Sequence, residues 1–130
     1  MGRRVCVSQK QEHALTILLS FDIDGTLEMG DPPGGVTADM VRHAYELGFI
    51  VGSCSDKPLS TQRKIWEEMA IEPAFVSAKH QLGDVKASIE ADEYYHMGDR
   101  DTDLQAAKDN DFGFWWHYEA EKQPWLEMRP

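Results

Sequence analysis

The sequence predicts an α/β protein with a three-layer Rossmann-like fold and a central parallel sheet of about five strands. Short apolar segments typical of buried strands alternate with segments whose apolar residues recur at helical spacing. Strands that alternate with helices are joined by right-handed crossovers, which makes the sheet parallel. A chain of 130 residues has room for one domain with a single core and little room for a second. We therefore expect one catalytic domain over 1–130.

The first half of the chain supplies two strands and the helix between them. Residues 15–23 are mostly apolar, which suits a central strand covered on both faces. The segment 28–35 is rich in turn-forming residues. Thr37 is a suitable N-cap for a helix whose apolar residues recur at helical spacing, and Gly48 is its expected stop. A second strand is predicted over 49–55.

The second half repeats this alternation. Pro58 opens a helix that carries an apolar stripe. The elements expected after it are strand 74–77, a helix marked by Leu82, Val85 and Ile89, strand 93–97, a short helix from Leu104 to Lys108, and strand 112–116. The core is thus expected over about 15–117, between an N-terminal arm at 1–13 and a tail at 118–130. The tail is mostly polar, and we expect it to pack loosely or not at all.

Composition excludes several classes of protein. Hydrophobic residues make up 42% of the chain and charged residues 28%, a balance that excludes disorder throughout. The formal net charge of -10 argues against broad nucleic-acid binding, because phosphate backbones attract basic surfaces. It is compatible with an acidic pocket for a divalent cation, although an acidic surface explains most of the charge equally well.

The chain also lacks the signals of a secreted or membrane protein. Cys6 and Cys54 are its two cysteines, too few and too unpatterned for a disulfide scaffold. No segment approaches the roughly 20 apolar residues of a membrane span. The segment 1–13 has no apolar stretch of the kind that a signal peptide needs. We expect a cytoplasmic protein without a membrane partner.

Two carboxylates follow the first predicted strand, in the string "LLSFDIDGTL" over 18–27. Asp22 and Asp24 are two residues apart, so in an extended segment their side chains point to one side. Like charges this close repel one another unless a cation neutralises them. Mg²⁺ is the candidate, because it prefers carboxylate oxygens and keeps waters that a phosphate can replace. The alternative is that an Asp here merely begins a turn.

A second acidic cluster follows the fourth predicted strand, in "HMGDRDTD" over 96–103. Asp99 ends the strand, and Asp103 lies about one helical turn later, so the two can share a face of the next helix. A preference of Asp for helix N-termini would explain either residue alone. It would not explain two acidic clusters at the ends of strands that are expected to be neighbours. Because ligands bind at the carboxyl ends of such strands, the two clusters predict a cation site.

A hydroxyl and a lysine complete the candidate site. Ser53 and Ser55 both lie near the end of the second predicted strand, and we prefer Ser55 as a donor to a phosphoryl oxygen. A cap for the helix at Pro58 is an equally good explanation of Ser55 taken alone. Lys79 follows the third predicted strand, where it can neutralise a phosphate and a nucleophile. Lys86 is its rival, but it lies more than a turn into a helix that leads away from the strand ends.

These strings resemble the motifs of the haloacid dehalogenase (HAD) superfamily of phosphohydrolases, over about 16–116. "DIDGTL" is similar to the first motif of that family and "GDRDTD" to its fourth, GDxxxD. Ser55 is in the place of the second motif and Lys79 in that of the third. The first and fourth motifs are very specific in this order, whereas a single Ser and a single Lys are weak signals. The resemblance implies a HAD-like fold and hydrolysis of phosphomonoesters.

The resemblance also implies the role of each site residue. Asp22 would be the nucleophile that forms an aspartyl-phosphate, and Asp24 the general acid and then the general base. Mg²⁺ would be held by the Asp22 side chain, the Asp24 main-chain carbonyl and Asp99, with support from Asp103. Lys79 would stabilise the charge of the transition state. Members of the family that break carbon–halogen bonds lack an acid in the place of Asp24, so its presence favours phosphate esters.

Many members of this family carry a cap domain over the site, and this chain has no room for one. Only 28–36 separate the first motif from the first predicted helix, so "EMGDPPGG" forms at most a short flap. An open site implies either a large substrate that closes it or a neighbouring subunit that does so. The expected partner is a phosphorylated small molecule or macromolecule, and nucleic acid is disfavoured by the charge. The sequence also leaves open whether the chain forms a homo-oligomer.

Two other functions remain as alternatives. A phosphoaccepting receiver-like signalling domain shares the sheet type, Mg²⁺ and an aspartyl-phosphate, but it places its acceptor Asp after the third strand and its Lys after the fifth. A catalytically inactive HAD-like binding protein would not need every catalytic residue. Trp115, Trp116 and Trp125 are candidates for a subunit contact, although a place in the core suits Trp115 or Trp116 better. His96 and His117 are assigned no role.

Overall fold

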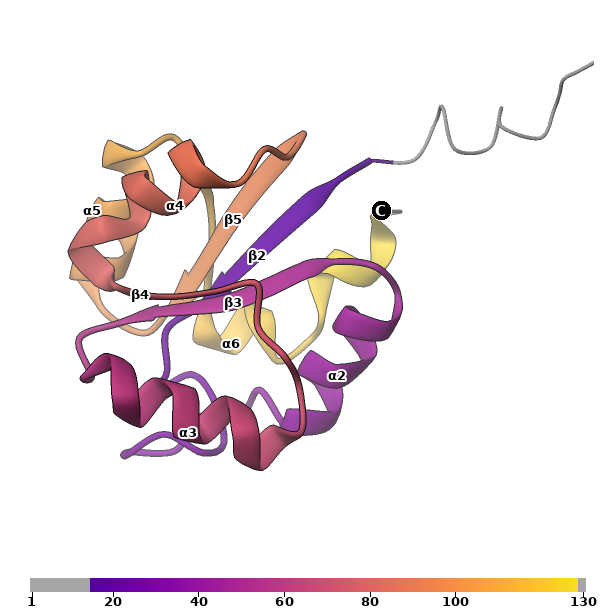
Figure 1. Cartoon of the computed structure of the whole chain (residues 1–130), viewed down its shortest axis with the longest axis vertical. Coiled ribbons are helices and arrows are strands. Elements are labelled where there is room, and N and C mark those ends of the chain that lie inside the picture. The colour runs from indigo at the N-terminus through magenta and orange to yellow at the C-terminus, as the bar shows by residue number, and fades with distance from the viewer. Residues whose placement is uncertain (1–14, 129–130) are drawn as a thin grey trace, which may run out of the picture.

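The computed structural model describes residues 15–128, and within them it forms a five-stranded parallel sheet between two layers of helices (Figure 1). The strand order is β4-β3-β2-β5-β6. This confirms the predicted three-layer α/β fold and the number of strands. The expected arm at 1–13, with Cys6, lies outside the described residues. The strands are β2 (Ile17–Phe21), β3 (Ile50–Ser55), β4 (Phe75–Ala78), β5 (Glu93–Gly98) and β6 (Gly113–Trp116).

Helices cover both faces of the sheet. Those over one face are α2 (Ala38–Glu46), α3 (Leu59–Met69) and α6 (His117–Ala120), and those over the other are α4 (Leu82–Ser88) and α5 (Asp101–Asp109). Two short 3₁₀ segments are Lys79–Gln81, which leads into α4, and Pro124–Glu127 near the end of the chain. No helix of the described residues is long and apolar enough to cross a membrane.

The local signals in the sequence account for the helix ends. The Thr37 hydroxyl accepts a hydrogen bond from the Met40 amide at 3.2 Å and caps α2 as predicted. Gly48 stops this helix with a φ of 103°, in the region that favours glycine. α5 begins at Asp101, three residues before the predicted start at Leu104. The prediction was late because the first turn of this helix is polar and adds nothing to the apolar periodicity.

The central strand is fully buried. Every residue of β2 is buried, as expected for a parallel strand with helices on both faces. Its alternate residues Ile17, Leu19 and Phe21 enter the larger core cluster beneath α2 and α3, while Leu18 enters the smaller cluster on the other face. β2 pairs with β3 on one side and with β5 on the other, which places the ends of all three strands at one edge.

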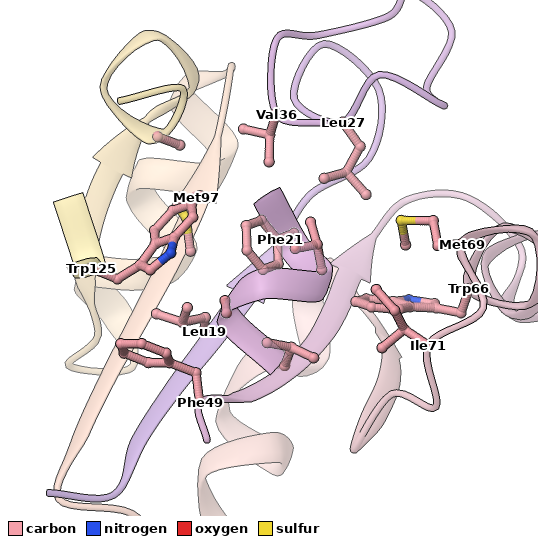
Figure 2. Packing of buried hydrophobic residues seen from close by; sticks show 14 of the residues in the cluster. Leu19, Phe21, Leu27, Val36, Phe49, Trp66, Met69, Ile71, Met97 and Trp125 are labelled. Atoms are coloured by element: carbon pink, nitrogen blue, oxygen red, sulfur yellow. The ribbon is translucent and has the colours of Figure 1, made fainter. Parts of the chain in front are cut away.

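The expectation of a loose C-terminal tail is wrong for the part of the tail that the structure describes. The Trp125 side chain is 0% exposed and packs edge-on against Phe21, with ring centroids 5.8 Å apart (Figure 2). Ala120 of α6 is buried in the same cluster. One large aromatic residue is enough to anchor a polar segment, because an aromatic side chain buries 150–250 Å². Trp125 is therefore part of the core and is not available for a subunit contact.

Candidate active site

The register of the sheet brings the two acidic clusters together. Phe21 of β2 lies beside Met97 of β5, and the Asp22 amide donates to the Met97 carbonyl at 2.8 Å. Asp22 and Asp99 therefore follow directly after two neighbouring strands. Carboxylate oxygens of Asp22, Asp99 and Asp103 all lie within 4.8 Å of one another. The predicted convergence of the two clusters is confirmed for Asp22, Asp99 and Asp103, but not for the Asp24 side chain.

Two glycines make this close approach feasible. A side chain at Gly25 would overlap the Asp99 carboxylate, and the φ of Gly25, 76°, is in the left-handed region. A side chain at Gly98 would overlap the Asp103 carboxylate. The backbone at Gly25 therefore packs directly against the Asp99 carboxylate, and the backbone at Gly98 packs directly against the Asp103 carboxylate.

The three carboxylates fit a bound cation. The Oδ1 atom of Asp99 is buried and has no hydrogen-bond partner within the described part of the chain. A buried acceptor without a partner is costly, and three carboxylates this close repel one another. A hard cation with oxygen ligands would satisfy the orphaned atom and balance the charge.

Lys79 is inserted among the carboxylates. Its Nζ atom lies 3.2 Å from Asp22 Oδ2 and 3.2 Å from Asp103 Oδ1, and the side chain is 7% exposed. Burial alone would lower the pKa of Lys79, but the negative charges of Asp22 and Asp103 have the larger effect, so the pKa of Lys79 is raised. The lysine therefore stays protonated and supplies one fixed positive charge.

The two buried carboxylates next to Lys79 differ in their proton affinity. Burial, and then the charge of Asp103, raises the pKa of Asp22 to about 7, against the opposing charge of Lys79. Asp103 is buried too, which by itself raises its pKa. The hydrogen bond from His96 and the charges around it more than compensate, so the pKa of Asp103 is lowered. The described residues therefore stabilise the negative charge of Asp22 less than that of Asp103.

Asp24 lies apart from this cluster. Its Oδ1 atom accepts a hydrogen bond from the Asp31 amide at 2.8 Å and lies 3.2 Å from Lys57 Nζ. Asp31 belongs to the flap, whose ends are joined by a bridge between Leu27 and Val36. The Asp24 carboxylate is 35% exposed at the edge of the site, where it can reach a ligand and exchange protons with water.

The two candidate serines have different surroundings. The Ser53 hydroxyl donates to Gln62 Oε1 at 2.7 Å and accepts from Trp66 Nε1 at 2.9 Å, so it belongs to the core. The Ser55 hydroxyl accepts from the Lys57 amide at 3.2 Å, which leaves its own proton free to donate. The structure places Ser55, and not Ser53, at the site.

The two candidate lysines are separated in the same way. Lys86 Nζ donates to the carbonyls of Asn110 at 3.3 Å and Asp111 at 3.0 Å, and it lies 5.0 Å from the centroid of the Tyr94 ring. Lys86 thus stabilises the C-terminal end of α5, away from the carboxylates. Lys79 is the lysine at the site.

The site residues border a small cavity. Its volume of about 90 Å³ suits a phosphoryl group, and it adjoins a wider depression of about 410 Å³ between the 3₁₀ segment Lys79–Gln81 and α5. Arg100 supplies a positive charge at this cavity that we did not predict from the sequence. Its position directly after Asp99 in "GDRDTD" is the signal that could have indicated it. The cavity is lined by Asp22, Asp24, Ser55, Asp56, Lys79 and Arg100.

Comparisons with known proteins support the fold. No family model matches the sequence, and no curated protein matches it. A solved structure described as "the core domain of a putative phosphoglycolate phosphatase" from Streptococcus pneumoniae TIGR4 is similar to this chain, with a TM-score of 0.56. The sequences are 20% identical, and the match covers 80% of this chain and 81% of that one. At this identity the likeness establishes a shared fold.

Proposed function

We propose that this chain is a Mg²⁺-dependent phosphohydrolase of the HAD type that hydrolyses phosphomonoesters through an aspartyl-phosphate on Asp22. The observation that carries the proposal is the position of Asp22. Its carboxylate is buried, lies 3.2 Å from Lys79, belongs to a group of three converging carboxylates and borders a cavity of phosphoryl size. The shared fold with a described phosphatase core adds support.

The metal would be held by the side chains of Asp22, Asp99 and Asp103 and by the Asp24 main-chain carbonyl. The unsatisfied Oδ1 atom of Asp99 and the crowding of carboxylates support this assignment. When bound, Mg²⁺ supplies a positive charge that lets an anionic nucleophile approach an anionic phosphate. The chemistry of carboxylate oxygens favours Mg²⁺ over softer metals.

Four side chains of the site carry out the two chemical steps of the proposed reaction. An Asp22 oxygen attacks phosphorus, the bond from phosphorus to the leaving oxygen breaks, and Asp24 donates a proton to that oxygen. In the second step Asp24 takes a proton from a water molecule, whose oxygen attacks phosphorus and breaks the bond to Asp22. Lys79 and the free Ser55 proton stabilise the charge on the phosphoryl oxygens. The exposure of Asp24 suits a residue that must serve both the leaving group and water.

The leaving group has an open approach. The flap is short, and the depression of about 410 Å³ adjoins the phosphoryl cavity through the shared residues Asp56 and Lys79. A phosphorylated small molecule can place its leaving group there, and a phosphorylated macromolecule can cover the mouth of the site. A second copy of the chain could cover it in the same way. We place this activity in the cytoplasm.

The direct test is hydrolysis of p-nitrophenyl phosphate by the metal-free full chain, with and without added Mg²⁺. We expect turnover with Mg²⁺ and none in excess EDTA. A screen of phosphorylated sugars, other metabolites and oligonucleotides under the same conditions would then identify the substrate class. Absence of turnover on every ester would contradict the proposal. A stable phosphoryl group on Asp22 without turnover would instead support the receiver-like alternative.

Lys79 and Lys86 provide a matched pair of variants. Lys79→Ala is expected to reduce kcat/KM for p-nitrophenyl phosphate by about 10²-fold or more, because it removes a buried charge aimed at the phosphoryl cavity. Lys86→Ala is expected to leave kcat/KM within about twofold and to lower only the melting temperature, because it loosens the end of α5. Steady-state kinetics and thermal unfolding measure both. Similar losses of kcat/KM in the two variants would contradict the assignment of Lys79.

A further inference from the structure

A buried histidine lies directly behind the carboxylate cluster and has no part in the chemistry proposed above. His96 points from β5 toward α5, and its Nε2 atom lies 2.8 Å from Asp103 Oδ1. On the other side of the ring, Nδ1 lies 2.8 Å from the Ser20 hydroxyl of β2. Ser20, His96 and Asp103 are all 0% exposed. The three residues form a continuous buried chain from the central strand to the acidic site.

The chemistry of Asp103 determines the direction of its hydrogen bond with His96. An ionised carboxylate can only accept, so the His96 Nε2 atom carries the proton that Asp103 receives. In the neutral ring, Nδ1 is then the acceptor, and the Ser20 hydroxyl donates to it. Each ring nitrogen therefore has one partner, and the two bonds together fix the orientation of the imidazole.

The orientation of Asp103 in turn depends on His96. Asp103 Oδ1 is shared between His96 and Lys79, and Oδ2 accepts from the Arg100 amide at 3.2 Å. Lys79 is also bound to Asp22, so it pulls Asp103 toward that carboxylate as well as neutralising it. His96 donates to the same oxygen as Lys79, and its ring is held between Ser20 of β2 and Asp103 of α5. Without it, the Lys79 ammonium and the Arg100 amide would be the described partners left to orient the Asp103 carboxylate.

We propose that His96 is a positioning residue for the cation site, which fixes the orientation of the Asp103 carboxylate beside Asp22 and Asp99 and is itself held by Ser20. This inference rests on the proposed function, because it assigns His96 to the metal site of that function. Partners that orient a metal ligand in this way typically change metal affinity by 10–100-fold when they are removed. The competing explanation is that His96 only fills and satisfies the core.

Two substitutions of His96 distinguish these explanations. In His96→Gln the side-chain amide nitrogen takes the place of Nε2 and can still donate to Asp103. In His96→Asn the shorter amide reaches only as far as Nδ1, so it keeps the bond to Ser20 and loses the bond to Asp103. Both variants replace the imidazole with a neutral amide, and a purely structural role predicts the same Mg²⁺ affinity for both, whatever their difference in stability.

The experiment measures Mg²⁺ binding by calorimetry to the metal-free full chain, with no phosphate ester present. We expect His96→Gln to keep the Kd for Mg²⁺ within about threefold of the parent and His96→Asn to weaken it by about tenfold or more. Equal Kd values in the two variants would overturn the inference. A parent chain that binds no Mg²⁺ would overturn the metal site of the proposed function as well, so the two failures are distinguishable.

Ser20→Ala is the second variant if His96→Asn does not fold. It removes the support of the imidazole and leaves Asp103 and its other partners in place. A Kd for Mg²⁺ that is several-fold higher than in the parent would support the inference, and an unchanged Kd would contradict it. Thermal unfolding of each variant in EDTA reports the effect on the core separately from the effect on the metal.

Discussion

Asp22→Asn is expected to lower kcat for p-nitrophenyl phosphate by about 10⁴-fold or more, because the amide that replaces the carboxylate is not a nucleophile. Loss of a nucleophile usually removes almost all of the covalent pathway and leaves only the weak effects of binding and of the surrounding charges. The substitution keeps the size of the side chain, so the cavity and the contact with Lys79 are preserved in shape. The measurement is kcat at saturating substrate and Mg²⁺.

Asp39→Asn is the matched control for this variant. The Asp39 carboxylate is 93% exposed on α2, pairs with Arg42 at 2.7 Å and is not among the residues that line the phosphoryl cavity. We expect its kcat to equal that of the parent. Mass spectrometry after a rapid acid quench should find a phosphoryl group on the parent and on Asp39→Asn but not on Asp22→Asn. Turnover by Asp22→Asn close to that of the parent would refute the nucleophile assignment.

The same substitution, Asp22→Asn, is expected to stabilise the metal-free protein. In the folded chain the pKa of Asp22 is about 7 instead of 3.8, because of burial and the nearby charge of Asp103. The folded state therefore binds the proton more tightly than the unfolded state does. Stability is lost as pH rises from about 4 to about 7, and the whole cost is present above pH 7. A neutral amide does not carry this cost, and Lys79 keeps Asp103 as a partner.

Thermal unfolding in EDTA at about pH 5 and about pH 8 measures this effect. The melting temperature of Asp22→Asn should exceed that of the parent, and the difference should widen with pH to the order of 5 °C. Asp39→Asn should show no such widening. Added Mg²⁺ should stabilise the parent more than the variant, because the variant has lost a charged ligand. A difference that narrows as pH rises would contradict the electrostatic account of Asp22.

The fold was largely predictable because its signals are local. The buried strands, the Thr37 cap and the Gly48 stop each depend on residues within a few positions of one another, and the structure confirms them. The polar start of α5 was not found, because an amphipathic pattern is weak in a first turn made of charged residues. The packing of the tail was missed for a different reason. The environment of Trp125 is set by Phe21, which is far away in the sequence.

The candidate site was predictable in part. Four acidic positions followed from strand ends, and the structure brings Asp22, Asp99 and Asp103 together while Asp24 stays at the edge. The structure places Ser55 at the cavity and Ser53 in the core, and the role of Ser55 as a donor to phosphate stays a prediction. Arg100 was not predicted, although it stands inside the string "GDRDTD" that carries Asp99 and Asp103.

By itself, the sequence determined which acidic side chains follow the strand ends and the order in which strands and helices follow one another, because both depend on near neighbours in the chain. Only the tertiary structure decided which lysine meets the carboxylates and what lies behind them. Ser20 and His96 are 76 residues apart in the sequence and adjacent in space. Their contact arises because β2 and β5 pair in parallel, a consequence of long-range strand order that local periodicity does not contain.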